Sequence, residues 1–157
     1  MTPSPGAPFI RQYRSEDRPK LEAMYRGFEP KGAAEGLPPV RDEKIQRWLD
    51  YLDGQAHCLV AFAGESEERI SGHVILAGGE DGDLELALFV HQDFRGQGLG
   101  LALAQAAVRE ARRLGARRIW LTVTTENRAA LRIYERCGFR ALPGKWLMEL
   151  EMELLLS

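Results

Sequence analysis

Residues 89–100 read Phe89-Val90-His91-Gln92-Asp93-Phe94-Arg95-Gly96-Gln97-Gly98-Leu99-Gly100, and the rest of the chain is best understood from this segment outward. The apolar run Leu84–Val90 leads into it and predicts a buried strand. From Leu99 onward, small and apolar residues recur at helical spacing, which predicts a helix over Leu99–Leu114. Gly115 then follows where a left-handed C-cap is expected. The segment therefore joins a strand to the N-terminus of a helix.

Three glycines in five residues lie at this strand-to-helix junction. Unpaired backbone N–H groups and the positive end of the helix dipole favour an anion there. Glycine at alternate positions lets the backbone approach a phosphate closely. Arg95 adds a forked cation that suits phosphate oxygens. The segment is therefore interpreted as a phosphate-binding loop.

Other glycine-rich loops fit less well. A ligand-free turn would not need three glycines and an arginine. A dinucleotide fingerprint needs glycine or alanine where Leu101 stands, and a Walker loop needs a lysine that is missing here. The pattern that fits is [RQ]-x-x-G-x-[GA], with Arg95, Gly98 and Gly100 at its fixed positions. With this motif the chain resembles the GNAT superfamily of acyl-CoA-dependent N-acyltransferases, in which the loop holds the coenzyme A pyrophosphate.

A second signature of that superfamily follows at the expected separation. Ile119–Val123 predicts the next strand, and Asn127 opens a segment with Tyr134 seven positions later and Gly138-Phe139 after it. Asn127 is interpreted as an N-cap, as a coenzyme contact, or as both. Either signature alone would be weak evidence, and the two together make the resemblance specific.

The resemblance implies an α/β fold: a single-domain, GNAT-like mixed twisted β-sheet of about seven strands flanked by about four helices. It also implies that the strands ending at Val90 and Val123 splay apart, and that the pantetheine arm of acetyl-CoA lies between them. The coenzyme contacts carried over are Phe89, Val90, Arg95, Gly96, Gln97, Gly98, Leu99, Gly100, Leu101, Asn127 and Tyr134.

The patterns elsewhere give the order β-α-α-β-β-β-α-β-α-β. Strands are expected near 9–13, 57–63, 70–77 and 146–154, and helices after Ser15-Glu16-Asp17 and from Asp42. Trp48 and Tyr51 on the second helix are expected in the core. Residues 1–8 are predicted to be a disordered lead, and 9–157 the acetyltransferase domain. Residues 27–39 form a Pro- and Gly-rich loop, interpreted either as a border of the acceptor site or as a mobile surface loop.

Composition excludes several classes of function. The chain has 157 residues, a net charge of -2 and 45% hydrophobic residues, which predicts one globular domain without a nucleic-acid-binding surface. No membrane span or signal peptide is apparent. Two cysteines, Cys58 and Cys137, and no metal-ligand spacing predict a cytoplasmic protein without a metal. A homodimer is left open.

Transfer of an acetyl group to a primary amine requires the amine to lose a proton. A lysine-like amine has a pKa near 10.4, so its deprotonation at pH 7 costs about 4.6 kcal/mol. Glu85 is the candidate base because it is a lone carboxylate in the apolar strand before the loop. The same position often carries a glutamate base in the superfamily. The alternative for Glu85 is that its side chain simply faces solvent. His73 is the second candidate for the base.

Tyr134 is the candidate partner of the leaving thiolate. The alternative is that Tyr134 only packs in the core. The ordinary pKa of a tyrosine is near 10 and that of a thiol is near 8.5, so full proton transfer from the tyrosine to the thiolate is unfavourable. A hydrogen bond to the thiolate, followed by its late protonation, is therefore expected. Neither cysteine suggests an acyl-enzyme, so direct attack in a ternary complex is expected. The acceptor, either a small amine or a protein lysine or N-terminus, is not identified by the sequence. The alternative function is a non-catalytic acyl-CoA-binding sensor module.

Overall fold

The computed structural model of the chain describes residues 8–32, 37–64, 66–78, 81–144 and 148–156. The predicted disordered lead therefore lies outside the described residues except for Pro8, and Trp146 of the last expected strand lies outside them too.

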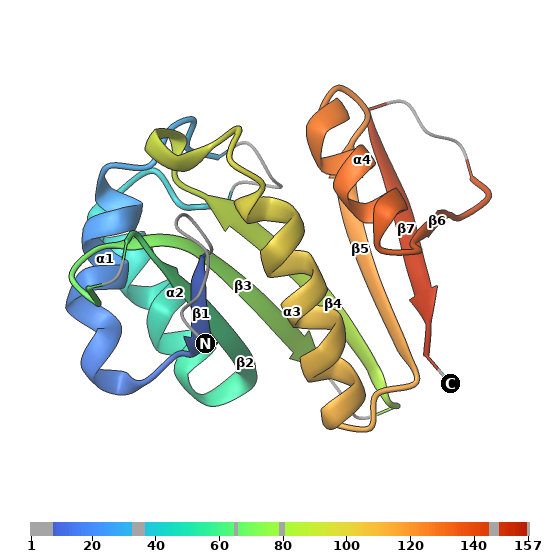
Figure 1. Cartoon of the computed structure of the whole chain (residues 1–157), viewed down its shortest axis with the longest axis horizontal. Helices are drawn as coiled ribbons and strands as arrows, with labels where there is room; N and C mark the ends of the chain where they lie inside the picture. Colours follow the sequence, from blue (N-terminus) through green and yellow to red (C-terminus); the bar gives the residue numbers. More distant parts are fainter. Residues whose placement is uncertain (1–7, 33–36, 65, 79–80, 145–147, 157) are drawn as a thin grey trace.

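A single mixed sheet of seven strands organises the molecule, in the order β1-β2-β3-β4-β5-β7-β6 (Figure 1). Its neighbours pair antiparallel except β4 and β5, which pair in parallel. The strands are β1 (Phe9–Gln12), β2 (Ala56–Phe62), β3 (Ile70–Gly78), β4 (Asp83–Val90), β5 (Arg118–Thr124), β6 (Arg140–Ala141) and β7 (Glu149–Leu155). The helices are α1 (Arg18–Arg26), α2 (Asp42–Gln55), α3 (Leu99–Arg113) and α4 (Arg128–Arg136), with short 3-10 turns at Ser15–Asp17 and Gln92–Phe94.

The helices cover the two faces of the sheet and create two apolar cores. Side chains alternate between the faces along each strand, so Leu84 and Leu86 of β4 join one core while Phe89 joins the other. The first core is closed by α3 and α4, and the second by α1 and α2. Because α3 links β4 to its parallel neighbour β5, it forms the crossover that parallel strands require.

The seven-stranded sheet and four helices confirm the expected fold class. Gly115 has a φ of +78°, as its predicted place after α3 requires. Strand β6 was not predicted, because two residues are too few to show a period. The expectation for Tyr51 was wrong: its side chain is 60% exposed, because α2 turns that residue away from the sheet.

Candidate active site

The glycines of the loop between β4 and α3 serve different purposes. Gly96 and Gly98 have φ angles of +78° and +80°, which residues with side chains rarely adopt. A Cβ at either position would meet no atom within 4 Å, so conformation rather than space requires glycine. At Gly100, by contrast, a Cβ would lie 2.7 Å from Cδ1 of Ile133. Glycine at that position lets α3 approach α4 closely, a role that the sequence did not reveal.

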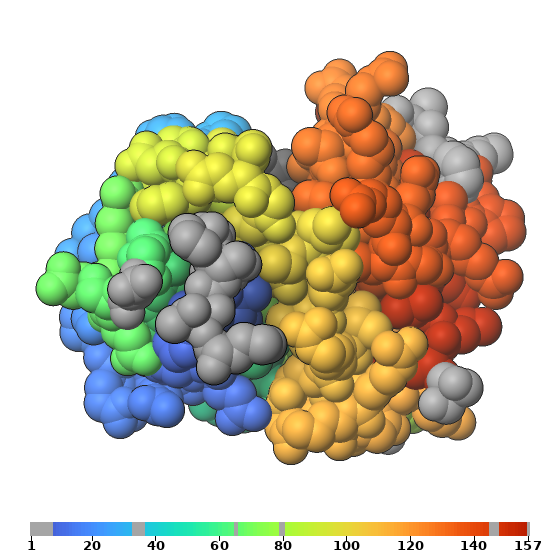
Figure 2. Space-filling view, viewed as in Figure 1, coloured from blue at the N-terminus to red at the C-terminus, as the bar shows by residue number. Residues whose placement is uncertain are grey.

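The first turn of α3 provides backbone N–H groups for an anion. Gly98 is the N-cap and supplies no side-chain cap, and the Ala102 N–H donates to its carbonyl at 3.1 Å. The N–H groups of residues 99–101 precede that first helical bond and have no acceptor in the helix. Leu99 is buried, Leu101 is half-buried and Gln97 is exposed. In Figure 2 a notch separates the yellow surface around this loop from the orange surface of α4.

Arg95 lies against the end of β4 and the segment after α1. Its Nε donates to the Val90 carbonyl at 3.0 Å, and its guanidinium carbon is 5.2 Å from the centre of the Phe28 ring. Partial burial lowers the pKa of Arg95, although a guanidinium remains charged at any physiological pH. Among the described residues only its Nε donates a hydrogen bond, so the other four N–H donors of the guanidinium remain for a phosphate.

Gln92 attaches the base of the loop to the segment that follows α1. Its Nε2 donates to the Gly27 carbonyl at 2.6 Å, and its Oε1 accepts from the Glu29 N–H at 2.9 Å. The partners are separated by 63 and 65 residues in the sequence. No local pattern could have revealed this clamp, because a single glutamine in a turn carries no periodic signal.

Strands β4 and β5 pair at only three residue pairs, 83–85 with 118–120, and then diverge (Figure 1). The His91 N–H donates to Ser71 of β3, so odd-numbered residues of β4 direct their backbone groups towards β3. The backbone groups of Leu88 and Val90 consequently face the gap. The inclusion of Phe89 in the coenzyme site is not supported: its backbone faces His73 on β3 and its ring is buried. Leu88, which the sequence analysis did not name, directs its backbone groups towards the gap instead.

Helix α4 carries Asn127 and Tyr134. The Asn127 side chain accepts a hydrogen bond from the Ala130 N–H at 3.1 Å, so its predicted N-cap role is confirmed. Tyr134 is 7% exposed, and its ring centre lies 5.7 Å from that of Phe139. Burial raises the pKa of Tyr134, which keeps its hydroxyl protonated at neutral pH. A protonated hydroxyl is a hydrogen-bond donor, the state that a leaving thiolate needs.

Glu85 lies at the closed end of the gap, paired with Ala77 of β3 and Trp120 of β5. It is half-buried, and burial raises the pKa of its carboxyl. Among the described residues, none forms an ion pair with it. Val90 lies five positions further along the strand, a distance of about 16 Å. Glu85 therefore stands at the far end of the gap from the glycine loop.

His73 is unsuited to act as the base. Its side chain is 0% exposed, and its Nδ1 lies 2.7 Å from the Tyr25 hydroxyl. Burial lowers the pKa of His73 to about 3. A buried imidazole of such low basicity would not take a proton from an amine at neutral pH.

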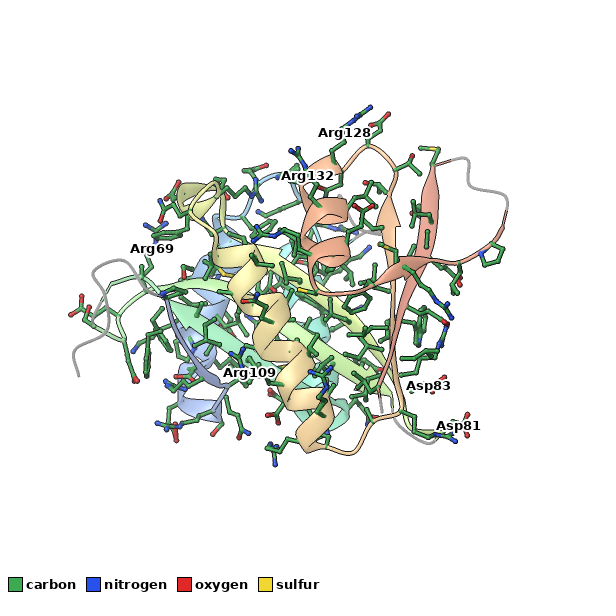
Figure 3. The ribbon with its side chains drawn as sticks, turned by 45° about the vertical axis from the view of Figure 1, so that its right-hand side comes forward. Arg69, Asp81, Asp83, Arg109, Arg128 and Arg132 are labelled. Carbon is green, nitrogen blue, oxygen red and sulfur yellow. The ribbon has the colours of Figure 1, made fainter. Side chains whose placement is uncertain are left out.

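Arginines add positive charge at the end of the molecule where the glycine loop lies. Arg128 and Arg132 project from α4, as Figure 3 shows, and both are exposed. Arg132 adjoins Ile133, the residue that limits the space beside Gly100. This placement suits the phosphates of a coenzyme whose pyrophosphate lies at α3.

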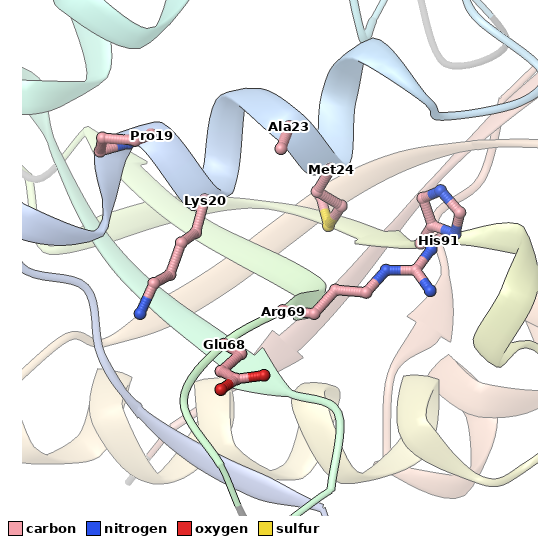
Figure 4. A pocket seen from close by; sticks show the side chains of 7 residues that line it. All are labelled: Pro19, Lys20, Ala23, Met24, Glu68, Arg69 and His91. Atoms are coloured by element: carbon pink, nitrogen blue, oxygen red, sulfur yellow. The ribbon is translucent and has the colours of Figure 1, made fainter.

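A hollow of about 240 Å³ beside α1 is lined by Lys20, Met24, Arg69 and His91, among others (Figure 4). Arg69 and His91, which line it, already have partners. Arg69 pairs with Asp93 at 2.6 Å, and the Nδ1 atom of His91 accepts from the Asp93 N–H at 3.2 Å. These contacts hold the turn that leads into the glycine loop.

The described part of the chain contains no group of three or more His, Cys, Asp or Glu residues arranged to hold a metal ion. Within the same ranges, no helix has both the length and the apolar character needed to cross a membrane.

Comparison with known proteins agrees with this geometry. The model of the acetyltransferase (GNAT) family matches residues 18–139. The uncharacterized N-acetyltransferase Rv2669 of Mycobacterium tuberculosis is 32% identical over 95 residues, which is 60% of each chain. A mycothiol acetyltransferase of Propionibacterium freudenreichii is 31% identical over 136 residues, 83% of this chain and 42% of that protein. The chain thus aligns with about 60% of the length of the first of these relatives.

Solved structures share the fold. The putative acetyltransferase yncA of Salmonella typhimurium, solved with its cofactor acetyl-CoA, superposes with a TM-score of 0.75 at 24% identity. The match covers 96% of this chain and 95% of that one.

Proposed function

The chain belongs to the acetyltransferase (GNAT) family, and on this premise we propose that it transfers an acetyl group from acetyl-CoA to a primary amine by direct attack in a ternary complex. The observation that carries the proposal is the gap between β4 and β5 beside the free first turn of α3. A coenzyme needs both features at once, because the first turn of α3 can hold its pyrophosphate and the gap can hold its extended arm.

The donor would be held by backbone groups more than by side chains. The N–H groups of residues 99–101 offer hydrogen bonds to the pyrophosphate. The backbone of Leu88 and Val90 offers the edge of a strand, with which the amides of the pantetheine arm can pair. The four remaining N–H donors of Arg95 add hydrogen bonds to the phosphates.

The acceptor amine attacks the thioester carbonyl, and a new C–N bond forms as the C–S bond breaks. Glu85 takes the amine proton, directly or through a water. Its raised pKa brings the carboxyl closer to the pH at which it works, while a residue paired with a cation would be a weaker base. The carbonyl carbon is never attached to the protein.

The leaving thiolate accepts a hydrogen bond from Tyr134. Because burial raises the pKa of that hydroxyl, complete proton transfer to the sulfur is uphill, and the hydrogen bond carries the stabilisation. The thiolate then takes its proton late from solvent, Tyr134 keeps its own proton, and Glu85 releases the amine proton to solvent.

The test uses two glycines with the same backbone conformation. Gly98 and Gly115 have φ angles of +80° and +78°, and a Cβ at either meets nothing within 4 Å. Gly98→Glu and Gly115→Glu therefore suffer the same backbone strain, but only Gly98→Glu places a carboxylate at the anion site. Calorimetry should show that Gly98→Glu abolishes acetyl-CoA binding while Gly115→Glu retains it. Equal affinity in the two variants would remove the proposed donor site.

Turnover is measured by release of free thiol from acetyl-CoA against a panel of amines and peptides. An enzyme releases thiol in proportion to an acceptor. Coenzyme binding without thiol release from any acceptor in the panel would instead support a sensor module. Both cysteines are free in the structure, which supports our proposal of a reducing, cytoplasmic setting.

A further inference from the structure

The side chain of Gln92 binds both peptide groups that flank Phe28. Its Nε2 donates to the carbonyl of Gly27, and its Oε1 accepts from the N–H of Glu29. Phe28 follows the end of α1 and belongs to no helix or strand. A segment of this kind has no hydrogen-bond ladder of its own, so the two bonds from Gln92 fix the backbone at Phe28.

Phe28 lies between the second apolar core and Arg95. Its side chain is 4% exposed, and its ring centre is 5.8 Å from that of Tyr25 and 5.9 Å from that of Phe89. The guanidinium carbon of Arg95 is 5.2 Å from the same ring centre. A guanidinium at this distance is attracted to the electrons of the ring. Phe28 is therefore a fixed platform for the arginine of the glycine loop.

Arg95 is held at two places and keeps its charge available. One place is the Phe28 ring, and the other is the Val90 carbonyl, to which its Nε donates at 3.0 Å. The neighbouring Arg69 differs, because it pairs with Asp93 at 2.6 Å and also lies 4.8 Å from the centre of the Phe94 ring. Of these two arginines at the turn, Arg95 is thus the one whose charge no carboxylate among the described residues neutralises.

An arginine that is ordered before a ligand arrives binds that ligand more tightly. Ordering a long side chain is among the larger entropy losses for any residue, and binding is weaker when this loss occurs on association. Here the protein itself orders Arg95, with its Nε anchored and its other N–H groups left for an anion.

We propose that Gln92 is a positioning residue of the donor site, which fixes Phe28 so that Phe28 holds Arg95 ready for the phosphates of acetyl-CoA. This inference rests on the proposed function, because it requires the pyrophosphate at the glycine loop. Gln92 acts through Phe28 and Arg95, since both ends of its amide are already bonded to backbone. Coenzyme affinity thus depends on a segment more than sixty residues away in the sequence.

The first test is Gln92→Met, which keeps the length of the side chain and removes both hydrogen bonds. Calorimetry should show acetyl-CoA binding about tenfold weaker, because Arg95 must then be ordered on binding. Gln105→Met makes the same exchange at an exposed position of α3 and should leave the affinity unchanged. Thermal unfolding shows that each variant is folded.

A double-mutant cycle with Arg95→Ala separates positioning from a general structural role. If Gln92 acts through Arg95, Gln92→Met should change the affinity less than twofold once Arg95 is gone. Phe28→Leu provides a second route, because it removes the ring and retains the backbone bonds of Gln92. It should weaken binding about as much as Gln92→Met, and this loss should also vanish in Arg95→Ala.

A measurement without coenzyme tests the positioning apart from the proposed function. In protein labelled with ¹⁵N-arginine, the Nε–H resonance of Arg95 should move towards that of a solvent-exposed arginine in Gln92→Met. Three results would overturn the proposal: an unchanged resonance, wild-type affinity in folded Gln92→Met, or an equal loss of affinity with and without Arg95. If the wild type bound no acetyl-CoA while the resonance still moved, the proposed donor site would fail instead.

Discussion

At the scale of single residues, the opposite acid–base roles proposed for Tyr134 and Glu85 are both favoured by burial. Burial disfavours the charged form of each, so the pKa of both groups is raised. For a tyrosine, the result is a hydroxyl that stays protonated and donates a hydrogen bond. For a glutamate, the result is a carboxylate that binds a proton more readily. Each shift suits the role proposed for the residue.

Tyr134→Phe should lower turnover by about 10²-fold, because the hydroxyl proposed to stabilise the leaving thiolate is lost while the ring still packs on Phe139. Acetyl-CoA affinity should change little, because backbone groups provide most of the proposed contacts. The measurement is kcat under conditions in which the chemical step limits the rate, with Tyr51→Phe as the exposed control. Wild-type turnover in Tyr134→Phe would make the tyrosine a core residue only.

Glu85→Gln should reduce kcat/KM most near neutral pH and progressively less as the pH approaches the pKa of the acceptor amine. The reason is that free amine then arrives already deprotonated and no base is needed. A pH profile of kcat/KM measures this, with Glu151→Gln on the exposed face of β7 as the control. A loss of equal size at every pH would count against Glu85 as the base.

The change in thermal stability caused by Glu85→Gln should depend on pH in a defined direction. A carboxyl whose pKa is raised by folding stabilises the protein while protonated, and that contribution is lost as the pH rises through the folded-state pKa. The charged carboxylate is therefore destabilising near pH 7, and glutamine removes this cost. Thermal unfolding of Glu85→Gln should show a gain in Tm near pH 7 that is smaller at about pH 4. A uniform loss of Tm would indicate a structural role instead.

At the scale of elements, the sequence predicted most helices and strands with long periodic patterns to within a residue or two, while the last strand, expected from residue 146, begins at Glu149. Helix α3 was visible from its apolar spacing and from Gly115 at its end. The Asn127 cap of α4 was visible from residue type alone. The contact between α3 and α4 could not be predicted, since Gly100 shows no difference from its loop neighbours until Ile133 is placed beside it.

That contact can be tested by a pair of substitutions. Gly100→Ala puts a Cβ 2.7 Å from Cδ1 of Ile133, and such overpacking costs about 1–3 kcal/mol against a gain of about 1 kcal/mol in helix propensity. Ile133→Val removes Cδ1, so the double variant should recover much of the loss. Denaturant unfolding of the two single variants and the double variant gives the coupling. Additive effects would show that the two side chains do not interfere.

At the scale of the whole molecule, the sheet consists of two parts that share only a short seam. Strands β1 to β4 carry α1, α2 and α3, while β5 to β7 carry α4, and three residue pairs join β4 to β5. The family resemblance predicted this divergence and named Val90 beside it, but it did not name Leu88. Gln92 and Arg95 were placed in the loop without their partners, because Gly27, Phe28 and Glu29 lie more than sixty residues away. Sequence patterns report local periods, and such contacts are set by topology.

The divergence of β4 from β5 predicts an alternating pattern of amide hydrogen exchange. The Ala87 and Phe89 N–H groups face β3 and should be protected with or without ligand. The Leu88 and Val90 N–H groups face the gap and should exchange freely in the unliganded protein. Acetyl-CoA in the gap should protect these two by pairing with the strand edge. The protection should increase with the fraction of protein that has acetyl-CoA bound. At a free acetyl-CoA concentration a hundredfold above Kd, binding should raise the free energy of unfolding by about 2.7 kcal/mol.

Residue-resolved exchange by NMR measures this pattern, with Gly98→Glu as the variant that cannot bind and Gly115→Glu as the one that can. Protection of Leu88 and Val90 should appear with acetyl-CoA in wild type and Gly115→Glu and be missing in Gly98→Glu. Equal exchange of odd and even residues in the free protein would contradict the register on which the donor site rests. Protection by coenzyme elsewhere, with both amides still exchanging, would place the pantetheine arm outside the gap.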